Sequence, residues 1–586
     1  MNLKDIHSAA DIRGLGIPEL KQLCDDLRQT FLVKIAAHGG HVGPNLGLVE
    51  ATVALHYVFD TPQDKIVFDV SHQTYIHKMI TGRIEAFLDP KHYDDISGYT
   101  NPGESPYDLF TIGHTSTAVS LAGGIAKGRD LRGEKYNVVA LVGDGSLSGG
   151  EAFEGLDVGA TLGSNFIVVV NDNQMAIAED HGGLYSDLKT LRESNGTDPD
   201  NYFKALGYDY IYVDKGNDVE ALIDAFRRVK GTDHPVVVHI NTVKGYGYAP
   251  AVKDKERFHW SMPFDLKTGE LLQPDDSEDY SDIFATEMLR QMNEIPAVCV
   301  LTAATPAILG FTPDKRAEAG RQFIDVGIAE QEACAMASGI AKAGGRPCFG
   351  VMSSFIQRAY DQMSQDIAIN NMPVVLNIFG GTILGLTDVT HLGWFDIALI
   401  SNIPGWVYLA PTTVEEYLAM QRWAMAQTDH PVAIRIPGGR IVHTDEPVEQ
   451  NYSDLNRFLK VKEGSRVAII GAGAFMQIAL ETAKQLADKG VDATVINPRY
   501  LSGLDVEMLT DLERDHQLVV TIEDGVLDGG FGEKVARFYG DRPMRTLCYG
   551  LRKQFLDRYD RREILLDNRL TAPQLTEDIL AALNRW

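Results

Sequence analysis

Short apolar runs rich in β-branched residues alternate with longer helical patterns between residues 20 and 245. Three of these runs are Val138–Val142, Phe166–Val170 and Val236–Ile240. A strand followed by a helix and another strand is the unit from which parallel sheets are built, because the helix returns the chain to the same end of the sheet. The sequence therefore predicts an α/β fold with a parallel sheet in this region.

The rhythm stops twice, and each interruption predicts a domain boundary. Residues 265–282 form the polar stretch DLKTGELLQPDDSEDYSD, which is typical of a linker. The acidic stretch 445–456 precedes Arg466–Ile470 and Ala493–Ile496, which are expected to begin a third αβ unit. A chain of 586 residues is also too long for one hydrophobic core. We expect three α/β domains over residues 1–262, 282–445 and 455–586, with strands in the second at Val298–Leu301, Pro347–Val351, Val374–Ile378 and Trp406–Leu409.

Charge and cysteine content limit the partners of the chain. The formal net charge is −27 without a basic cluster, so the surrounding field is expected to repel nucleic acid and anionic membranes. The five cysteines show no CxxC spacing, which argues against a zinc site or a disulfide framework. The sequence has neither an apolar leader nor an uninterrupted apolar run of about 18 residues. We expect a cytoplasmic protein that acts on small molecules, and any anionic substrate must be bound by local cations or backbone donors.

The most specific local signal is Gly143-Asp144-Gly145 at the end of a predicted strand. Residues 146–171 separate it from Asp172-Asn173, which follows the next predicted strand. This spacing resembles the thiamine diphosphate motif, in which GDG is followed by a pair ending in Asn. Mg²⁺ prefers hard oxygen ligands and usually shares them with phosphates. We expect the Asp144 carboxylate, the Asn173 side-chain oxygen and the Met175 carbonyl to hold Mg²⁺.

Each part of this motif has a simpler explanation when it is taken alone. Gly-Asp-Gly is common turn chemistry after any strand. The combination with two strands and an Asn at the required interval favours the metal site. In that case Gly145 would let the backbone approach the phosphates, and a helix beginning near Ser148 would direct its N-terminal amides toward them.

Glu330 lies in the stretch FIDVGIAEQEACAMASGIAKAGG, after apolar residues and before a predicted helix of small residues. Thiamine chemistry needs a carboxylic acid beside N1′ of the aminopyrimidine, because protonation there favours the tautomer that removes the C2 proton. An apolar setting raises the pKa of such an acid and suits it to this task. The alternative is that Glu330 only caps the helix.

Long stretches outside these two sites carry further motifs. In the first half they are GGHVGPNLGLVEATVALHYVFDTPQDKIVFDVSHQTYIHKMITGR (39–83), GHTSTAVSLAGGIA (113–126) and VKGYGYAPAVKD (243–254). In the second half they are FIDVGIAEQEA (323–333), SSFIQRAYDQ (353–362), THLGWFD (390–396), INPRYLSGLD (496–505) and VVTIEDGVLDGGFG (519–532). On these motifs, which span most of the chain in order, it resembles the 1-deoxy-D-xylulose 5-phosphate synthase family of the transketolase superfamily.

The resemblance implies roles for the three domains and for individual residues. The first domain resembles the diphosphate-binding domain, the second the pyrimidine-binding domain and the third the transketolase C-terminal domain. His41, His72 and His391 resemble histidines that transfer protons with donor and acceptor oxygens, a task that suits imidazole near neutral pH. Arg358 resembles a substrate-facing arginine. The residues that resemble cofactor contacts are His72, Gly113, His114, Thr115, Gly145, Ser146, Asn173, Tyr248 and Glu330.

Some of these residues and motifs have alternative interpretations. A lone histidine on an α/β loop is usually structural, and Arg358 can form an ion pair with Asp361 on the same predicted helix. Gly471-Ala472-Gly473 resembles the start of a dinucleotide fingerprint, which would indicate an oxidoreductase. The third glycine position holds Met476, however, and no acidic residue follows at the usual interval. Ordinary strand-to-helix turn chemistry explains these glycines better.

The sequence departs from the family on the substrate side. Gly380 and Gly438 stand where the family has two arginines that clamp the phosphate of the acceptor, and Arg440 is the nearby residue that could substitute for them. Restoring both arginines is expected to improve the use of glyceraldehyde 3-phosphate. The chain is also much shorter than the family pattern between Ile177 and Tyr202, which could open the site or change a lid. Other departures are Thr387 at the position of an aspartate beside Asp388, Met352 at that of a tyrosine and Pro44 at that of a serine.

The expected activity follows from the resemblance together with these departures. We expect a thiamine diphosphate- and Mg²⁺-dependent transferase that decarboxylates pyruvate or a similar 2-oxo acid and adds the acyl carbanion to an aldehyde. The acceptor is expected to differ from glyceraldehyde 3-phosphate. The alternatives are transketolase-type two-carbon transfer from a ketose phosphate and a catalytically inactive regulatory paralogue. A homodimer is expected by resemblance to the superfamily.

Overall fold

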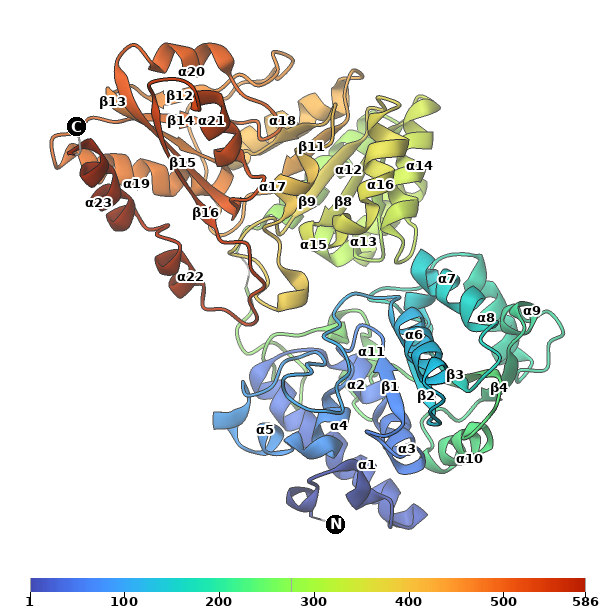
Figure 1. Cartoon of the computed structure of the whole chain (residues 1–586). Helices are drawn as coiled ribbons and strands as arrows, with labels where there is room; N and C mark the ends of the chain where they lie inside the picture. Colours follow the sequence, from blue (N-terminus) through green and yellow to red (C-terminus); the bar gives the residue numbers. More distant parts are fainter. Residues whose placement is uncertain (1, 276, 585–586) are drawn as a thin grey trace. The chain divides into compact units, whose positions relative to one another are not determined.

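The computed structural model describes residues 2–275 and 277–584. They form two compact units: the first unit contains residues 2–275 with Gly327–Ala329, and the second unit contains residues 277–326 and 330–584. Both units are built from largely parallel sheets covered by helices, which confirms the predicted α/β class (Figure 1). No helix within these two ranges combines the length and the apolar character needed to span a membrane.

The first unit contains one sheet of five parallel strands in the order β1-β2-β3-β5-β4. The three strands predicted here from β-branched runs are confirmed, and each is one or two residues longer than its run. The sequence analysis missed the two strands at the edges of the sheet. The bounds are β1 (Lys65–Phe68), β2 (Val138–Gly143), β3 (Phe166–Asp172), β4 (Asp209–Val213) and β5 (Pro235–Asn241).

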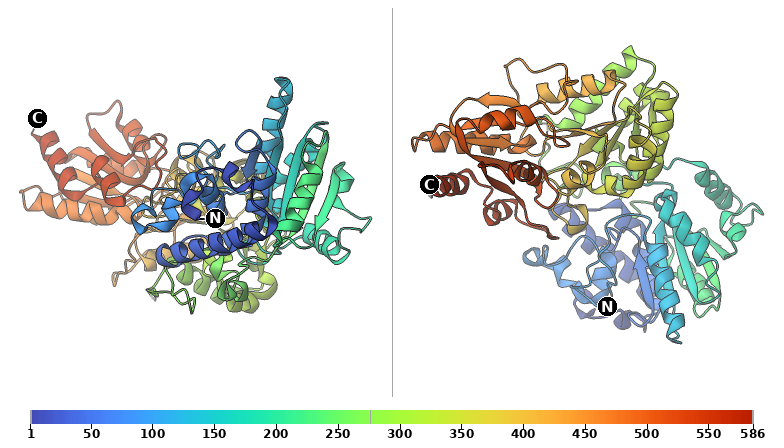
Figure 2. Two further views of the ribbon diagram at one scale, coloured as in Figure 1. Left: turned by 90° about the horizontal axis from the view of Figure 1, so that it is seen from below. Right: turned by 45° about the horizontal axis from the view of Figure 1, so that its top comes forward.

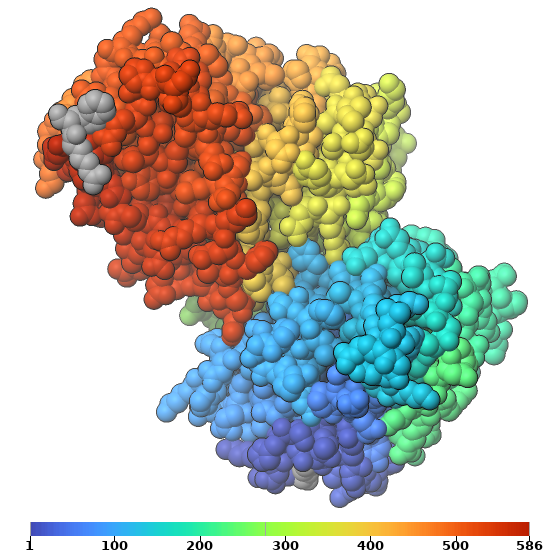
Figure 3. All heavy atoms as spheres, in the orientation of Figure 1, coloured from blue at the N-terminus to red at the C-terminus, as the bar shows by residue number. Residues whose placement is uncertain are grey.

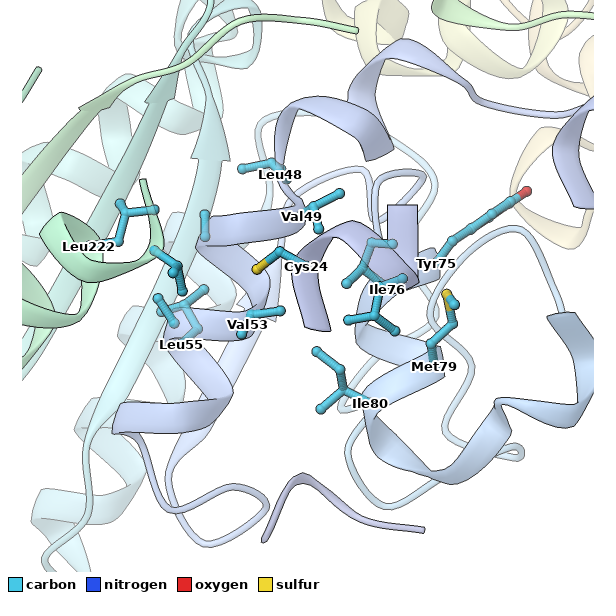
Figure 4. Close-up of a cluster of buried hydrophobic side chains, with 14 of the residues drawn as sticks. Cys24, Leu48, Val49, Val53, Leu55, Tyr75, Ile76, Met79, Ile80 and Leu222 are labelled. Carbon is cyan, nitrogen blue, oxygen red and sulfur yellow. The ribbon is translucent and has the colours of Figure 1, made fainter. Parts of the chain in front are cut away.

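The central strands of this sheet are apolar throughout because helices bury both faces. In β3, Ile167 and Val169 belong to one core, whereas Val168 and Val170 belong to the core on the opposite face. Fully burying one such side chain contributes about 1.5–3 kcal/mol to folding. Figure 4 shows the first of these cores, in which Cys24 lies close to Val49 and Val53. Helices α1 (Ile17–His38), α3 (Val49–Val58) and α10 (Val219–Val229) cover that face, and α6 (Ala118–Leu131) covers the other.

The second unit begins with helix α12 (Tyr280–Glu294), after the predicted linker, and contains two sheets. The first of them has six parallel strands in the order β10-β11-β9-β8-β6-β7, and the four strands predicted for this region are confirmed to within a residue at either end. Their bounds are β6 (Val298–Thr302), β7 (Phe323–Asp325), β8 (Arg346–Met352), β9 (Val375–Phe379), β10 (Val407–Leu409) and β11 (Val432–Arg435).

The last sheet has the order β12-β14-β13-β15-β16, with only β12 antiparallel. Val467 and Ile469 of β13 face α19 (Met476–Ala487) and α23 (Ala572–Leu583), which lie side by side (Figure 2). Ala468 and Ile470 face the opposite side and share one core with the six-stranded sheet. Figure 3 shows these orange and red segments packed directly against the yellow segments of the same unit. The bounds are β12 (Leu459–Lys462), β13 (Arg466–Gly471), β14 (Thr494–Asn497), β15 (His516–Val526) and β16 (Arg545–Leu551).

The glycines after β13 have a packing role. A Cβ atom on Gly471 would lie 2.8 Å from Cβ of Ala479 and 3.0 Å from Cα of Met476. The strand therefore needs glycine to let α19 pack closely against it. This supports the strand-to-helix interpretation of Gly471-Ala472-Gly473 over a dinucleotide site.

Candidate active site

Four loops leave the carboxyl ends of adjacent strands in the first unit. His72 follows β1, Asp144 follows β2, Asn173 follows β3 and Lys244 follows β5. Because these strands are parallel neighbours, their carboxyl ends share one edge of the sheet, where ligands bind in open α/β sheets. The sequence had singled out the first three residues, and Lys244 was missed.

Asp144 and Asn173 meet at this edge. The buried Asp144 carboxylate accepts hydrogen bonds from the backbone N–H groups of Asn173 at 2.9 Å and Gln174 at 2.5 Å. Asn173 is 8% exposed, and its Oδ1 has no hydrogen-bond partner within the described residues. A carboxylate beside an unsatisfied amide oxygen fits a hard divalent cation. Neither described range contains three or more His, Cys, Asp or Glu side chains grouped as metal ligands. The ligand set expected here contains only one residue of these types, Asp144, together with Asn173 and the Met175 carbonyl.

The shortened segment 177–202 folds back toward this edge. Met175 and Glu179 form an antiparallel bridge, and helix α8 (Gly183–Glu193) follows. A Cβ atom on Gly145 would lie 2.8 Å from Cβ of Ala176, so Gly145 is needed for this close approach. The Tyr185 hydroxyl of α8 donates to the backbone carbonyl of Asp144 at 3.2 Å. The segment thus supports the Asp144 loop.

Burial changes the pKa of three charged groups here. It raises the pKa of Asp180 to about 7, and it raises the pKa of Asp144 well above its usual value, an effect strengthened by the charge of Asp180. Burial also lowers the pKa of Lys244 to about 8, although both carboxylates oppose this. The Lys244 ammonium donates to the Ala176 carbonyl at 2.6 Å. The edge therefore combines two carboxylates and one cation in a desolvated setting.

The loop 113–117, which contains Gly113, His114 and Thr115, is fixed by Asp69. The buried Asp69 carboxylate accepts from the backbone N–H groups of Ser116 and Ala118, both at 2.9 Å. The Ser116 hydroxyl donates to the Ser146 carbonyl at 2.8 Å, which ties this loop to the Gly145-Ser146 loop. Asp69 was not predicted, although it stands three residues before His72 in the quoted motif.

The helix expected near Ser148 begins slightly later than predicted. A short 3₁₀ turn covers Gly145–Ser148, and α7 (Gly150–Gly159) follows. A Cβ atom on Gly149 would lie 2.1 Å from Oγ of Ser116, so the loop before α6 and the loop after β2 pack against each other at this glycine. The N-terminus of α7 therefore lies next to the predicted diphosphate loops, where its amides favour an anion.

Three histidines cluster in the first unit. The ring of His41 lies 4.8 Å from that of His72 and 5.6 Å from that of His259, and the rings of His72 and His259 are 5.2 Å apart. Desolvation lowers the pKa of His41 and His259 well below the usual value, and the positive charges of neighbouring groups lower it further. Both are therefore neutral at pH 7 and able to exchange a proton. His259 was not predicted, because RFH at residues 257–259 has no distinctive spacing.

Tyr248 lies in an aromatic cluster. Its ring centroid is 5.8 Å from that of Phe258 and 6.0 Å from that of Phe264. Its hydroxyl donates to the Leu266 carbonyl at 3.1 Å. The hydroxyl is thus already bonded within the fold, and a contact of Tyr248 with a cofactor would have to be made by its ring or backbone.

Glu330 is the first residue of helix α14 (Glu330–Lys342) in the second unit. It is 3% exposed, and its Oε2 accepts no hydrogen bond within the described residues. Burial raises its pKa, although Arg358, whose Nη1 lies 3.8 Å from Oε2, opposes the shift. A helix N-terminus favours a charged carboxylate. The capping interpretation therefore accounts for the position of Glu330 but not for its burial and raised pKa.

His391 lies near Phe355 in the same unit. Its Nδ1 is 2.9 Å from the Thr390 hydroxyl, and its ring centroid is 5.6 Å from that of Phe355. Arg358 stands on the short 3₁₀ helix Gln357–Ala359, one turn after Phe355. The second unit thus provides an acid, an arginine and a histidine on the loops around β8 and β9.

Comparisons with known proteins match the chain along its length. A family model described as 1-deoxy-D-xylulose-5-phosphate synthase matches residues 3–199, and models of the transketolase pyrimidine binding and C-terminal domains match residues 276–441 and 457–553. The 1-deoxy-D-xylulose-5-phosphate synthase of Symbiobacterium thermophilum is 39% identical over 95% of this chain and 91% of its own. That of Pelotomaculum thermopropionicum is 36% identical over 99% of this chain and 96% of its own. The chain belongs to the 1-deoxy-D-xylulose-5-phosphate synthase family.

Family membership makes the chain a transferase enzyme and implies thiamine diphosphate as its cofactor. It also confirms the resemblance inferred from the motifs. Among solved structures, a Campylobacter jejuni transketolase is 16% identical over 97% of this chain and 100% of its own, with a TM-score of 0.45. That similarity is too low to support any conclusion beyond those from the sequences.

The two glycines at the family's clamp positions follow neighbouring strands, β9 and β11. A Cβ atom on Gly438 would lie 2.2 Å from Cγ2 of Thr382, and Gly380 has a φ of +66°. Thr382 therefore occupies the space that a side chain at position 438 would need. An arginine at position 438 would require Thr382 to move, and the expected gain from restoring both arginines stays a prediction.

The steric relation between Gly438 and Thr382 predicts a stability effect. Gly438→Ala is expected to lower the free energy of unfolding by about 1–3 kcal/mol, because the added carbon overpacks the site. In a Thr382→Gly background the same change should cost much less, since the interfering atoms are absent. Denaturant unfolding of the four proteins of this cycle measures the difference. Equal costs in both backgrounds would show that Thr382 is not the obstacle.

Arg435 does not replace the clamp. It is 4% exposed and pairs with Asp396 at 2.7 Å and with Asp524, so its charge is already neutralised. Arg358 faces Glu330. Arg440 is exposed and forms no ion pair within the described residues, which makes it a candidate for a phosphate contact.

The loop 380–391 is held by a C-terminal segment of the same unit. Tyr559 donates to the Ile383 carbonyl at 2.8 Å, and Arg561 donates to the Gly385 carbonyl at 2.6 Å. Asp557 accepts from the backbone N–H of Val389 at 3.2 Å. Burial raises the pKa of the neighbouring Asp388, and the charge of Asp557 raises it further. The acidic side chains of Asp388 and Asp557 thus share this loop with the cations of Arg558 and Arg561.

Proposed function

We propose that the protein is a thiamine diphosphate- and Mg²⁺-dependent carboligase that decarboxylates pyruvate or a similar 2-oxo acid and joins the acyl group to an aldehyde. Glu330 carries this proposal, because a buried carboxyl group with a raised pKa and an Oε2 that accepts no hydrogen bond within the described residues suits protonation of N1′. The 1-deoxy-D-xylulose-5-phosphate synthase relatives support the reaction type. Release of CO₂ from pyruvate that requires the cofactor, Mg²⁺ and an aldehyde tests it.

The first unit is proposed to bind the diphosphate and the metal. Asp144, Asn173 and the Met175 carbonyl would hold Mg²⁺, since two of them already lie at one strand edge with an unsatisfied oxygen. The loop 113–115 and the Gly145-Ser146 loop would bind the diphosphate through backbone N–H groups. When bound, thiamine diphosphate supplies the electron sink of the reaction.

Protein side chains would control the protons. Glu330 holds the proton at N1′ of the pyrimidine. His41 and His259 are kept neutral by their lowered pKa, so each can accept a hydrogen bond from a substrate hydroxyl at one ring nitrogen and donate one to a developing alkoxide from the other. His72 shares their cluster, and His391 is proposed to act on the acceptor side. Arg358 is proposed to face the substrate carboxylate and to keep Glu330 from becoming too weak an acid.

Because the two clamp arginines are absent, we expect phosphorylated aldehydes to be poor acceptors. Each charge-assisted arginine–phosphate contact contributes about 1.5–3 kcal/mol, so losing two is expected to weaken binding of glyceraldehyde 3-phosphate about a hundredfold or more. Steady-state kinetics should therefore give a much higher KM for this aldehyde than in a family member with both arginines, measured side by side. An unphosphorylated aldehyde is expected to be the better acceptor.

Arg440 provides a control for this prediction. If Arg440→Ala leaves the KM for glyceraldehyde 3-phosphate unchanged, Arg440 does not replace the clamp. If the wild-type KM for glyceraldehyde 3-phosphate equals that of a family member with both arginines, the prediction of a different acceptor is contradicted. A rise in this KM in Arg440→Ala would then show that Arg440 binds the phosphate. The homodimer, the cytoplasmic location and the three domain boundaries remain predictions.

A further inference from the structure

Asp180 is a carboxylate in the first unit whose charge is not satisfied within the fold. It directly follows the bridge between Met175 and Glu179, at the start of the shortened segment. Both of its carboxylate oxygens are buried, and neither has a hydrogen bond of ordinary geometry to any described residue. Burying an ionised carboxylate without a partner is costly. The fold therefore places Asp180 where something else must compensate its charge.

The Asp180 carboxylate interacts with that of Asp144, the expected metal ligand. No ion pair joins either of them to a cationic side chain in the part of the chain that the structure describes. The nearest ammonium group, that of Lys244, donates instead to the carbonyls of Ala176 at 2.6 Å and Ile177 at 3.3 Å. Two like charges in contact repel unless a cation lies between them or a proton is shared.

Asp172, the third acid nearby, differs from this pair. Its carboxylate accepts from Arg192 of α8 and lies 2.8 Å from Nε2 of His239. Its charge is thus compensated within the fold. A further oxygen without a partner is Oδ1 of Asn173, a side chain that is 8% exposed. The buried side-chain oxygens without a hydrogen-bond partner at this edge are both carboxylate oxygens of Asp180, Oδ1 of Asn173 and the second oxygen of Asp172, Oδ1. Asp180 and Asn173, together with the Asp144 carboxylate, form a ligand set suited to a hard divalent cation.

We propose that Asp180 is an additional ligand of the divalent cation, directly or through a bound water, and that this second carboxylate lets the site bind the metal before the diphosphate arrives. The inference rests on the proposed function, since it assumes the Asp144 metal site. Two carboxylates balance a charge of two, so the diphosphate is no longer the main source of negative charge. The shortened segment would then help to bind the metal, because its first turn places Asp180 at the strand edge.

The test is Mn²⁺ binding to the full-length protein after removal of cofactor and metal, measured by electron paramagnetic resonance. Wild-type protein is expected to bind one Mn²⁺ without thiamine diphosphate. Asp180→Asn should weaken this binding about 10–100-fold, the usual cost of changing a group that supports a metal site. Saturating thiamine diphosphate should reduce the difference, because phosphate oxygens then contribute. Mg²⁺ calorimetry on the same proteins provides a second readout.

Glu179→Gln is the matched control, since Glu179 is exposed, lies next to Asp180 and carries the same charge. It should bind Mn²⁺ as wild type does, and thermal unfolding should show that both variants are folded. Equal Mn²⁺ affinity of wild type and Asp180→Asn without cofactor overturns the inference, as does an equal loss in Glu179→Gln. The proposed metal site at Asp144 is contradicted by a different result, namely full Mn²⁺ binding by Asp144→Asn in the presence of thiamine diphosphate.

Discussion

Replacing Glu330 with alanine is expected to leave thiamine diphosphate bound and to slow proton exchange at its C2 atom by about 10²–10⁴-fold, the usual contribution of one positioned acid. The buried carboxyl group is the group proposed to hold a proton at N1′, and alanine cannot replace it. Exchange is measured by mixing the loaded enzyme with D₂O, quenching with acid and recording the C2 signal by nuclear magnetic resonance. Calorimetry on the same variant confirms that the cofactor remains bound.

Glu332→Gln is the control for this experiment, because Glu332 is exposed in the first turn of the same helix. If Glu330 only stabilises the helix terminus, Glu330→Ala and Glu332→Gln should behave alike. Each should then lower the free energy of unfolding by about 0.3–1 kcal/mol and change C2 proton exchange little. Near wild-type exchange in Glu330→Ala would leave Glu330 as a helix cap. Glu330→Gln, which keeps the shape of the side chain but not the acid, should be as slow as Glu330→Ala.

Asp144→Ala is expected to abolish binding of both Mg²⁺ and thiamine diphosphate. The substitution removes a charged ligand, and it also removes the acceptor of the Asn173 and Gln174 backbone N–H groups, so the second ligand loses its support. The affinity for thiamine diphosphate in the presence of Mg²⁺ should fall by more than about a hundredfold, since even outer groups of metal sites are worth 10–100-fold. Isothermal calorimetry measures both affinities.

Asp157→Asn serves as the matched variant, because Asp157 is exposed on α7 and its substitution removes the same charge near the diphosphate loops. Its affinity for the cofactor should stay close to that of wild type. If both variants bind thiamine diphosphate with wild-type affinity, Asp144 does not hold the metal. If both lose it equally, general electrostatics rather than coordination is responsible.

The strands that the sequence predicted correctly are those with buried faces. Phe166–Val170 and Val138–Val142 are apolar without interruption because helices cover both sides of the sheet. Two of the strands that were missed have weak patterns, although the buried strands β11 and β15 were not predicted either. β7 spans only Phe323–Asp325, and β12 at Leu459–Lys462 is an edge strand with three exposed residues out of four. A short or solvated strand offers too little contrast for a sequence pattern to show it.

The sequence predicted those site residues that directly follow a strand. Asp144 and Asn173 stand directly after strands, and parallel strands bring their ends to one edge. Asp180 and His259 were missed because only the folded backbone brings them to the other site residues. The close approach of Thr382 to Gly438 could not be predicted either, because the two residues lie in different loops that only the folded structure brings into contact.

The protein is proposed to decarboxylate a 2-oxo acid and to join the remaining acyl group to an aldehyde. The most direct test supplies fully ¹³C-labelled pyruvate, thiamine diphosphate, Mg²⁺ and a set of phosphorylated and unphosphorylated aldehydes, with mass spectrometry of gas and products. We expect labelled CO₂ and an α-hydroxy ketone that contains the two remaining labelled carbons, with neither formed by Asp144→Ala or Glu330→Ala. Two-carbon transfer from a ketose phosphate without CO₂ from pyruvate would contradict it in favour of a transketolase, and bound cofactor without any product would indicate an inactive paralogue.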